Sequence, residues 1–289
     1  MNIRSLTGFL ALADPLPASA LKPLQDLAAA GREEFAQAGF PVQTTRVATQ
    51  PVPEIAPRDL TRFALELQTA AQAAGIQYAS LGAPRADHRL APLDLIEEIP
   101  AALAATENVF GSVQIASHEN GINLGAVMAT ARAIRTLADL KPDGFGDFRF
   151  AALANCPPHS PFFPVAYHQG ARPAFALATE GAPLAVQAFG EAHNLDAARA
   201  NLIQAVETAA QALEKVANDL AERFSFHFAG IDFSLAPFPE ESQSIGAAFE
   251  RLTGARFGEH GTLFAAGFIT DCLKRAHFQR TGFSGLMLP

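Results

Sequence analysis

Four short segments of the sequence combine residue types that can bind or transform a small molecule. They read "SHENGIN" (117–123), "NCPPHSPFFPVAYH" (155–168), "GIDFSLAPFPEESQS" (230–244) and "FGEHGT" (257–262). Histidine, aspartate and glutamate can exchange protons with a substrate, whereas asparagine, serine and threonine can orient one. Each segment lies beside a strand-like or a helix-like stretch, and sites in α/β folds collect at the joints between strands and helices.

The proline-rich segment carries a cysteine and two histidines, which leaves two chemical interpretations open. In the first, Cys156 is a nucleophile and His159 is its base. In the second, Cys156, His159 and His168 bind zinc together with His118 or Asp232, although His-x8-His is not a recognised zinc spacing. His118, His159 and His168 are therefore the candidate ligands of a divalent metal.

A third interpretation of the same segment is structural. Its four prolines fix the backbone and lower the entropy lost on ordering. The loop would then hold Phe163 and Tyr167 against one end of the core, present His168 to a site, and start at Asn155, an orienting residue. A rigid loop is also what a preorganised site requires.

The segment after residue 116 predicts a strand end followed by a helix start. His118 and Asn120 are candidates for acid–base chemistry and for substrate binding there, and Gly121 lets the backbone approach a ligand closely. Free N–H groups of the following helix favour an anion. The alternative is a helix cap with solvated polar side chains.

Asp232 and Ser234 alternate with Ile231, Phe233 and Leu235, so they lie on the opposite face of a strand. An unpaired buried aspartate is costly. Asp232 is therefore either paired or functional, and we predict it as the catalytic partner of the histidines, with Ser234 as a binding residue.

His260 lies beside Glu259 at another helix start, where the two could form an acid–base pair. Thr262 either binds substrate or caps that helix. Arg46 shares one strand face with Thr44, and an arginine from a core strand usually pairs with a carboxylate of a side chain or a substrate. We therefore predict Arg46 as a clamp for a carboxylate or phosphate.

Regular elements alternate along most of the chain. Apolar periodicity predicts helices within 19–39, 57–75, 93–106, 122–139, 195–224, 244–254 and 261–276, and β-rich runs predict strands within 3–12, 42–48, 76–82, 109–116, 148–154, 174–179, 226–236 and 281–289. Asn194 is expected to cap the helix at 195–224. This alternation is typical of parallel strands joined by helical crossovers, in a barrel or a wound sheet, and of one domain spanning 1–289.

Composition narrows the classes of function. The chain has 289 residues, a net charge of −8 and no run of Lys or Arg, so no nucleic-acid partner is expected. No apolar stretch approaches about 20 residues, so no membrane span is expected. Two distant cysteines favour a reducing compartment, and we predict a cytoplasmic protein. The first 14 residues imitate a short signal peptide, but a core strand explains them better. No nucleotide-cofactor motif is found.

Several of these segments together resemble the pyruvate formate-lyase-like family of unknown function. The similar motifs are "IRSLT", "VQTTRV", "SPFFPVAYHQG", "DFSLAP", "GEHGTLFAAGFITDCLKRA" and "TGFSGLMLP", and they run from residue 3 to residue 289. The resemblance implies a ten-stranded type of β/α barrel like that of glycyl-radical enzymes, with two parallel half-sheets packed antiparallel and helices outside. Longer members continue past "GFSGLMLP", so this chain is either a short member or a truncated one, which leaves open whether the last barrel segments are complete.

Three functional hypotheses follow. The first is a non-radical enzyme that binds a small polar or anionic metabolite in the barrel mouth and uses acid–base or metal-assisted chemistry. The second is a non-catalytic small-molecule sensor or regulator, and either protein could form a homo-oligomer. The third is a glycyl-radical enzyme, for which "RTGF" (280–283) is one residue short of the radical pattern.

Overall fold

The computed structural model describes residues 1–288, and one mixed sheet organises them. Its strands are β1 (Ile3–Leu10), β2 (Val42–Pro51), β3 (Tyr78–Gly82), β4 (Val109–Ser117), β5 (Gly121–Ile122), β6 (Phe150–Ala154), β7 (Ala174–Thr179) and β8 (His227–Asp232). The order is β5-β4-β3-β2-β1-β7-β8, and β6 also pairs with β4. All strands except β5 were expected from the sequence.

The sheet consists of two parallel groups that meet where β1 pairs with β7, and the short strand β5 pairs with β4 in the antiparallel sense. Strands β1, β2, β3, β4 and β6 run parallel, and β8 runs parallel to β7. Strand β1 pairs with β7 in the antiparallel sense. The prediction of an α/β chain with helices around a sheet is confirmed, whereas the ten-stranded barrel and the single domain stay predictions.

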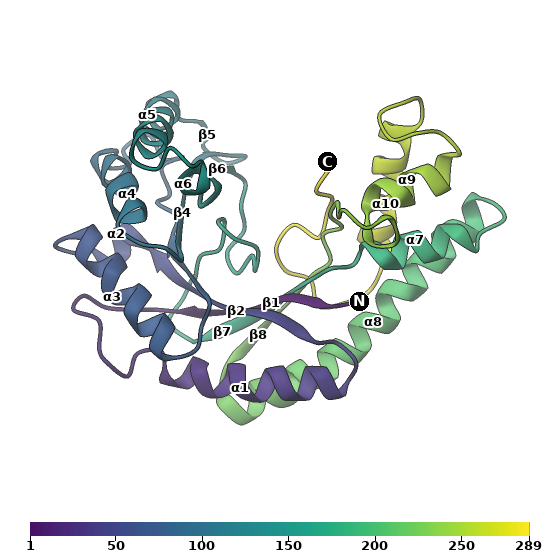
Figure 1. Cartoon of the computed structure of the whole chain (residues 1–289), viewed down its shortest axis with the longest axis horizontal. Coiled ribbons are helices and arrows are strands. Elements are labelled where there is room, and N and C mark those ends of the chain that lie inside the picture. Colours follow the sequence, from purple (N-terminus) through teal and green to yellow (C-terminus); the bar gives the residue numbers. More distant parts are fainter. Residues whose placement is uncertain (289) are drawn as a thin grey trace.

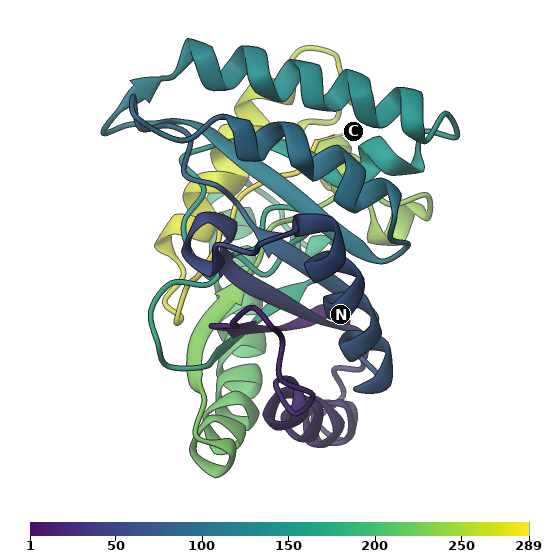
Figure 2. The ribbon, with the colours of Figure 1, turned by 90° about the vertical axis from the view of Figure 1, so that its left-hand side faces the viewer.

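Helices surround this sheet on its outer side. They are α1 (Lys22–Gln37), α2 (Val52–Ile55), α3 (Leu60–Ala73), α4 (Asp94–Ala104), α5 (Leu124–Leu140), α6 (Phe145–Phe148), α7 (Ala182–Gly190), α8 (Leu195–Phe224), η1 (Glu241–Gln243), α9 (Ile245–Thr253) and α10 (Thr262–Arg275). Figure 1 shows α3 to α6 on one side of an opening and α7, α9 and α10 on the other. In Figure 2, α4 and α5 lie side by side, and α1 packs along α8 at the opposite end of the molecule.

The predicted helix ends agree with the observed ones where a cap was named. The Asn194 side chain accepts a hydrogen bond from the Ala197 N–H and caps α8 as predicted. The Ser244 hydroxyl, whose role was not predicted above, accepts from the Gly246 N–H and caps α9. Helix α7 was not predicted, because apolar residues cover most of its surface and it shows little periodicity. The predicted last strand is wrong as far as the structure describes it: residues 280 and 286 make only isolated bridges to Ile231 and Leu235.

The loop at 155–170 crosses the inner face of the sheet, where the strands carry small hydroxyl residues. The Thr7 hydroxyl donates to the Pro161 carbonyl at 2.9 Å, and the Ser80 hydroxyl donates to the Ala166 carbonyl at 3.1 Å. The His168 N–H donates to the Thr49 carbonyl at 2.8 Å. These bonds satisfy buried carbonyls of a segment without secondary structure.

Candidate functional site

A cleft of about 750 Å³ opens on the inner side of the sheet. Its walls include Arg46, Tyr78 and Phe110 from the starting halves of β2, β3 and β4, Phe163 from the crossing loop, and Thr179 and Glu180 from the end of β7. The antiparallel junction brings these opposite strand ends together. Arg46 therefore lies near the amino end of its strand, and not at the carboxyl end where sites were expected.

Arg46 is a buried charged residue among those that line this cleft. Its side chain is buried, and Nε donates to the Thr44 hydroxyl at 3.0 Å, as the shared strand face predicted. The guanidinium carbon lies 5.1 Å from the centre of the Phe163 ring and 5.7 Å from that of Tyr78. Burial, with Arg4 nearby, lowers the pKa of Arg46 to about 10. Among residues 1–288, no carboxylate forms an ion pair with it.

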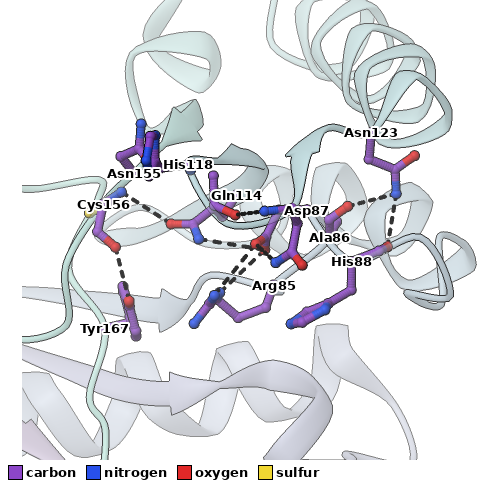
Figure 3. A network of polar contacts seen from close by, with 12 residues as sticks. Arg85, Ala86, Asp87, His88, Gln114, His118, Asn123, Asn155, Cys156 and Tyr167 are labelled. Carbon is purple, nitrogen blue, oxygen red and sulfur yellow. Dashed lines mark hydrogen bonds and ion pairs between the residues drawn. The ribbon is translucent and has the colours of Figure 1, made fainter.

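A second polar region lies at the carboxyl ends of β3 and β4 and centres on Asp87 (Figure 3). Asp87 is buried and accepts hydrogen bonds from Arg85 at 3.3 Å and from Asn120 at 2.8 Å. Burial disfavours its charged form, but these donors outweigh burial and hold the pKa of Asp87 below its usual range. The Gln114 amide also donates to Asp87, at 3.5 Å.

Several predicted residues join this region through hydrogen bonds between neighbouring segments. The side-chain oxygen Oδ1 of Asn155 accepts from the His118 backbone N–H at 2.6 Å, and the Tyr167 hydroxyl donates to the Cys156 backbone carbonyl at 3.0 Å. The side chains of His118 and Asn120 are exposed. Within the described residues, Asn120, Asn155 and Tyr167 thus connect loops, and none of them lines the cleft.

Asp232 and Ser234 lie in another place and hold the C-terminal segment. Asp232 Oδ1 accepts from the Ser234 hydroxyl at 2.6 Å and from the Ser284 N–H at 2.9 Å, and Oδ2 accepts from the Phe283 N–H at 2.9 Å. Burial raises the pKa of Asp232, and these hydrogen bonds oppose the rise. Gly282 packs directly on this carboxylate, because a Cβ there would lie 2.1 Å from Oδ2. The sequence predicted that Asp232 is either paired or functional, and these hydrogen bonds provide the pairing.

His168 and His159 form an imidazole pair in which His168 is buried and His159 is half-buried. His168 Nδ1 lies 3.2 Å from His159 Nε2, and His168 Nε2 has no hydrogen-bond partner within residues 1–288. The predicted metal set of His118, His159 and His168 is not assembled, since no group of three potential ligands that could hold a metal occurs in the described chain. His118 is exposed at the end of β4, and Asp232 is occupied by the C-terminal segment.

The histidine pair makes stability depend on pH. Burial, with His159 nearby, lowers the pKa of His168 to about 4. Its native form is thus neutral, whereas the unfolded chain takes up a proton below about 6.5, so stability falls as pH falls from 6.5 towards 4. Between pH 7 and pH 5, the lowered pKa of His168 should reduce the free energy of unfolding by about 2 kcal/mol. Urea denaturation at both pH values measures this change.

Two variants isolate this contribution. His168→Gln should flatten the pH dependence between pH 7 and pH 5, whereas His260→Gln, on an exposed loop, should leave it as in the unmodified chain. An equal pH dependence in the unmodified chain and in His168→Gln would contradict the assignment to His168.

Cys156 does not pair with His159, so the nucleophile hypothesis is wrong in its proposed base. Its sulfur lies 3.6 Å from the carbonyls of Pro157 and Val165, and burial raises the pKa of the thiol to about 12. A thiol in this state is a poor nucleophile. The other cysteine, Cys272, is buried among apolar residues of α10, as expected.

His260 and Thr262 lie in a separate exposed turn. The Thr262 hydroxyl accepts from the Gly258 N–H and donates to the Glu259 carbonyl, both at 2.9 Å. Thr262 therefore organises the turn before α10, whose first residue it is, and the capping alternative is wrong because no side chain of residues 1–288 caps this helix. Glu259 accepts from the Arg256 N–H and not from His260.

Sequence reasoning missed the other walls of the cleft and the Asp87 region. Tyr78 and Phe110 are members of strands whose alternation was visible, and the pairing of β2, β3 and β4 places them beside Arg46. Arg85 and Asp87 follow β3 in "GAPRAD", a polar strand end of the same kind as the four segments that were chosen.

The fold and the cleft define a mixed α/β protein with an aromatic, cationic cavity between two parallel strand groups. The family described as Uncharacterised ACR (DUF711) matches residues 1–289, and the chain belongs to this family. Within the described residues, no helix is both long and apolar enough to cross a membrane.

Several curated relatives are similar to most of this chain. A "UPF0210 protein" of Pelotomaculum thermopropionicum is 28% identical over 323 residues, covering 100% of this chain and 70% of the relative. One of Syntrophotalea carbinolica is 29% identical over 87% of this chain and 59% of the relative, and one of Neisseria gonorrhoeae is 28% identical over 92% and 62%. The chain thus spans 59 to 70% of these relatives. The comparisons do not indicate the relationship to pyruvate formate-lyase that the motifs suggested.

Proposed function

We propose that this chain binds a small anionic molecule in the cleft and that Arg46 recognises its negative charge. The observation that carries this proposal is a buried guanidinium without a carboxylate partner in residues 1–288. Burying an unpaired charge costs free energy, so an anionic ligand would remove a cost that the free protein bears. The volume of the cleft lies within the range of small-molecule sites, about 300–1,000 Å³.

The arrangement of the titratable groups favours binding without catalysis, which was the second hypothesis. His118, His168 and Asp232 do not line the cleft, and Asp232 and His168 are engaged by other parts of the chain. The proposed role is therefore that of a small-molecule sensor or regulator. Each ligand that binds should also be tested for conversion to a product. Turnover would contradict the sensor role and support the enzyme hypothesis.

Replacing Arg46 by methionine tests the role of the charge. Methionine is shorter than arginine but keeps an unbranched apolar side chain, and the change removes the charge and both free terminal nitrogens. The affinity for an anionic ligand should therefore fall by about tenfold to a hundredfold. Melting shifts with succinate, benzoate and inorganic phosphate identify a binding probe, and calorimetry then gives its Kd for both proteins. The matched control is Arg132→Met, which removes an exposed arginine paired with Glu97.

The same variant gives a second readout that separates binding from folding. Because Arg46→Met removes an uncompensated buried charge, its free energy of unfolding should equal or exceed that of the unmodified chain. Loss of binding together with preserved stability supports the proposal. If no anion in the panel binds the unmodified chain, or if Arg46→Met binds as tightly, the proposal is wrong.

A further inference from the structure

The aromatic walls around Arg46 form a connected group. The rings of Tyr78 and Phe110 meet edge to face with 5.5 Å between their centres, and Phe110 meets Phe163 in the same manner at 5.3 Å. Arg46 lies over both Tyr78 and Phe163. Aromatic rings therefore flank the guanidinium and exclude water from one of its sides.

Further phenylalanines stand at the mouth of the cleft with much of their surface in contact with solvent. Phe145 is 52% exposed, Phe148 is 69% exposed and Phe238 is 43% exposed. The first two rings stack on each other with 5.9 Å between their centres. Apolar surface gathered at the rim of a cavity is typical of a binding site, because a ligand removes it from water.

The hydrogen-bonding state of Arg46 limits the type of anion. Nε is used by Thr44, and no residue in 1–288 accepts a hydrogen bond from the two terminal nitrogens. Two parallel donors in one plane match the two oxygens of a carboxylate. The nearby Arg4 is engaged with Gln43 and Glu180, so a single guanidinium remains for the ligand.

Glu180 argues against a doubly charged ligand. Its carboxylate lines the same cleft, and it accepts hydrogen bonds from Gln43 at 2.6 Å and from Asn2 at 3.2 Å. Glu180 offsets the charge of Arg4, which leaves the single charge of the Arg46 guanidinium to balance a ligand, and a phosphate carries more negative charge than a carboxylate. A monoanion fits the charges of the cleft better.

We infer that the ligand is a planar aromatic carboxylate, bound by Arg46 through its carboxylate and packed through its ring against Phe163 and the phenylalanines of the rim. This inference rests on the proposed function and names the chemical class of its ligand. Aromatic rings prefer edge-to-face or offset contact with one another, and each such contact adds to the gain from burial alone. The cleft supplies the charge and the rings on adjacent walls.

Calorimetry with a matched set of ligands tests the class. Phenylacetate should bind the unmodified chain about tenfold more tightly than hexanoate, which has the same charge and a flexible aliphatic chain. Phenylacetamide, which lacks the charge, and phenyl phosphate, which has more of it, should both bind more weakly than phenylacetate. Indole-3-acetate checks that a larger ring is accepted.

Two leucine variants separate ring contact from charge. Phe163→Leu keeps an apolar side chain and should weaken phenylacetate by about threefold to tenfold with hexanoate unchanged. Phe264→Leu, on α10 away from the cleft, should change neither affinity. Circular dichroism of each variant confirms that the fold is kept.

The outcomes distinguish this inference from the proposed function. If hexanoate binds as tightly as phenylacetate and both depend on Arg46, the aromatic class is wrong and anion binding stands. If phenyl phosphate is preferred, the carboxylate assignment is overturned. If none of these ligands or the earlier anions binds the unmodified chain, the proposed function fails and the inference fails with it.

Discussion

Replacing Asp232 by alanine is expected to lower the free energy of unfolding by about 3–5 kcal/mol, because buried donors of two segments lose their acceptor. The carboxylate joins the end of β8 to Phe283 and Ser284, fifty residues away in the sequence. Without it, these N–H groups either stay unsatisfied or leave the core with the segment that carries them. Both results remove packing from Phe233 and Leu235.

Urea denaturation measures this loss of stability, and two further variants serve as comparisons. Asp232→Asn keeps one acceptor oxygen but turns an amide towards one of the backbone donors, so its loss should lie between those of the alanine variant and the unmodified chain. Asp219→Ala, at an exposed position of α8, should change stability by less than about 0.5 kcal/mol. An Asp232→Ala protein as stable as the unmodified chain would show that the C-terminal segment contributes little to the fold.

Replacing Gly82 by alanine is expected to cost a similar amount, about 3 kcal/mol or more, through a clash between two backbones. A Cβ on Gly82 would lie 2.2 Å from the carbonyl oxygen of Gln50. No side-chain rotation can relieve this contact, so β2 and β3 would have to separate where their register shifts. The separation would break the 2.9 Å hydrogen bond from the Gly82 N–H to the Thr49 hydroxyl.

Gly267→Ala is the matched control and should act in the opposite direction. Gly267 lies inside α10, and nothing lies within 4 Å of a Cβ built on it. Glycine inside a helix is destabilising by about 0.5–1 kcal/mol relative to alanine, so this variant should be more stable than the unmodified chain. Thermal unfolding of both variants checks the contrast, and equal changes in the two would contradict the backbone-clash argument.

Local sequence patterns were sufficient for most of the regular elements. The three- and four-residue apolar steps of 195–224 correspond to α8, and alternation along 42–48 correctly placed Arg46 beside Thr44. Both patterns depend on residues within a few positions of one another. Helix α7 has apolar residues on most of its surface, because it packs against both α8 and α9, and such a helix shows little periodicity.

The candidate site depended on information that local patterns do not carry. Arg46 was identified because a cation in a core strand requires an explanation, but its neighbours Tyr78 and Phe110 follow from strand order. His118, His168 and Asp232 were predicted as catalytic residues because of their residue types. A buried polar group can hold a loop in place as readily as it can take part in a reaction. Asp232 shows this, because its acceptors are all used by backbone and serine donors of this chain.

The antiparallel pairing of β1 with β7 gives any occupant of the cleft a mechanical role. Arg46 belongs to the parallel group on one side of this junction, and Glu180 and Phe238 belong to the other side. A molecule that touches both sides acts as a non-covalent crosslink, and its binding free energy adds to the resistance of the junction against opening. Amide protons of β1 and β7 should then exchange more slowly together as ligand concentration rises, so the junction itself would report occupancy.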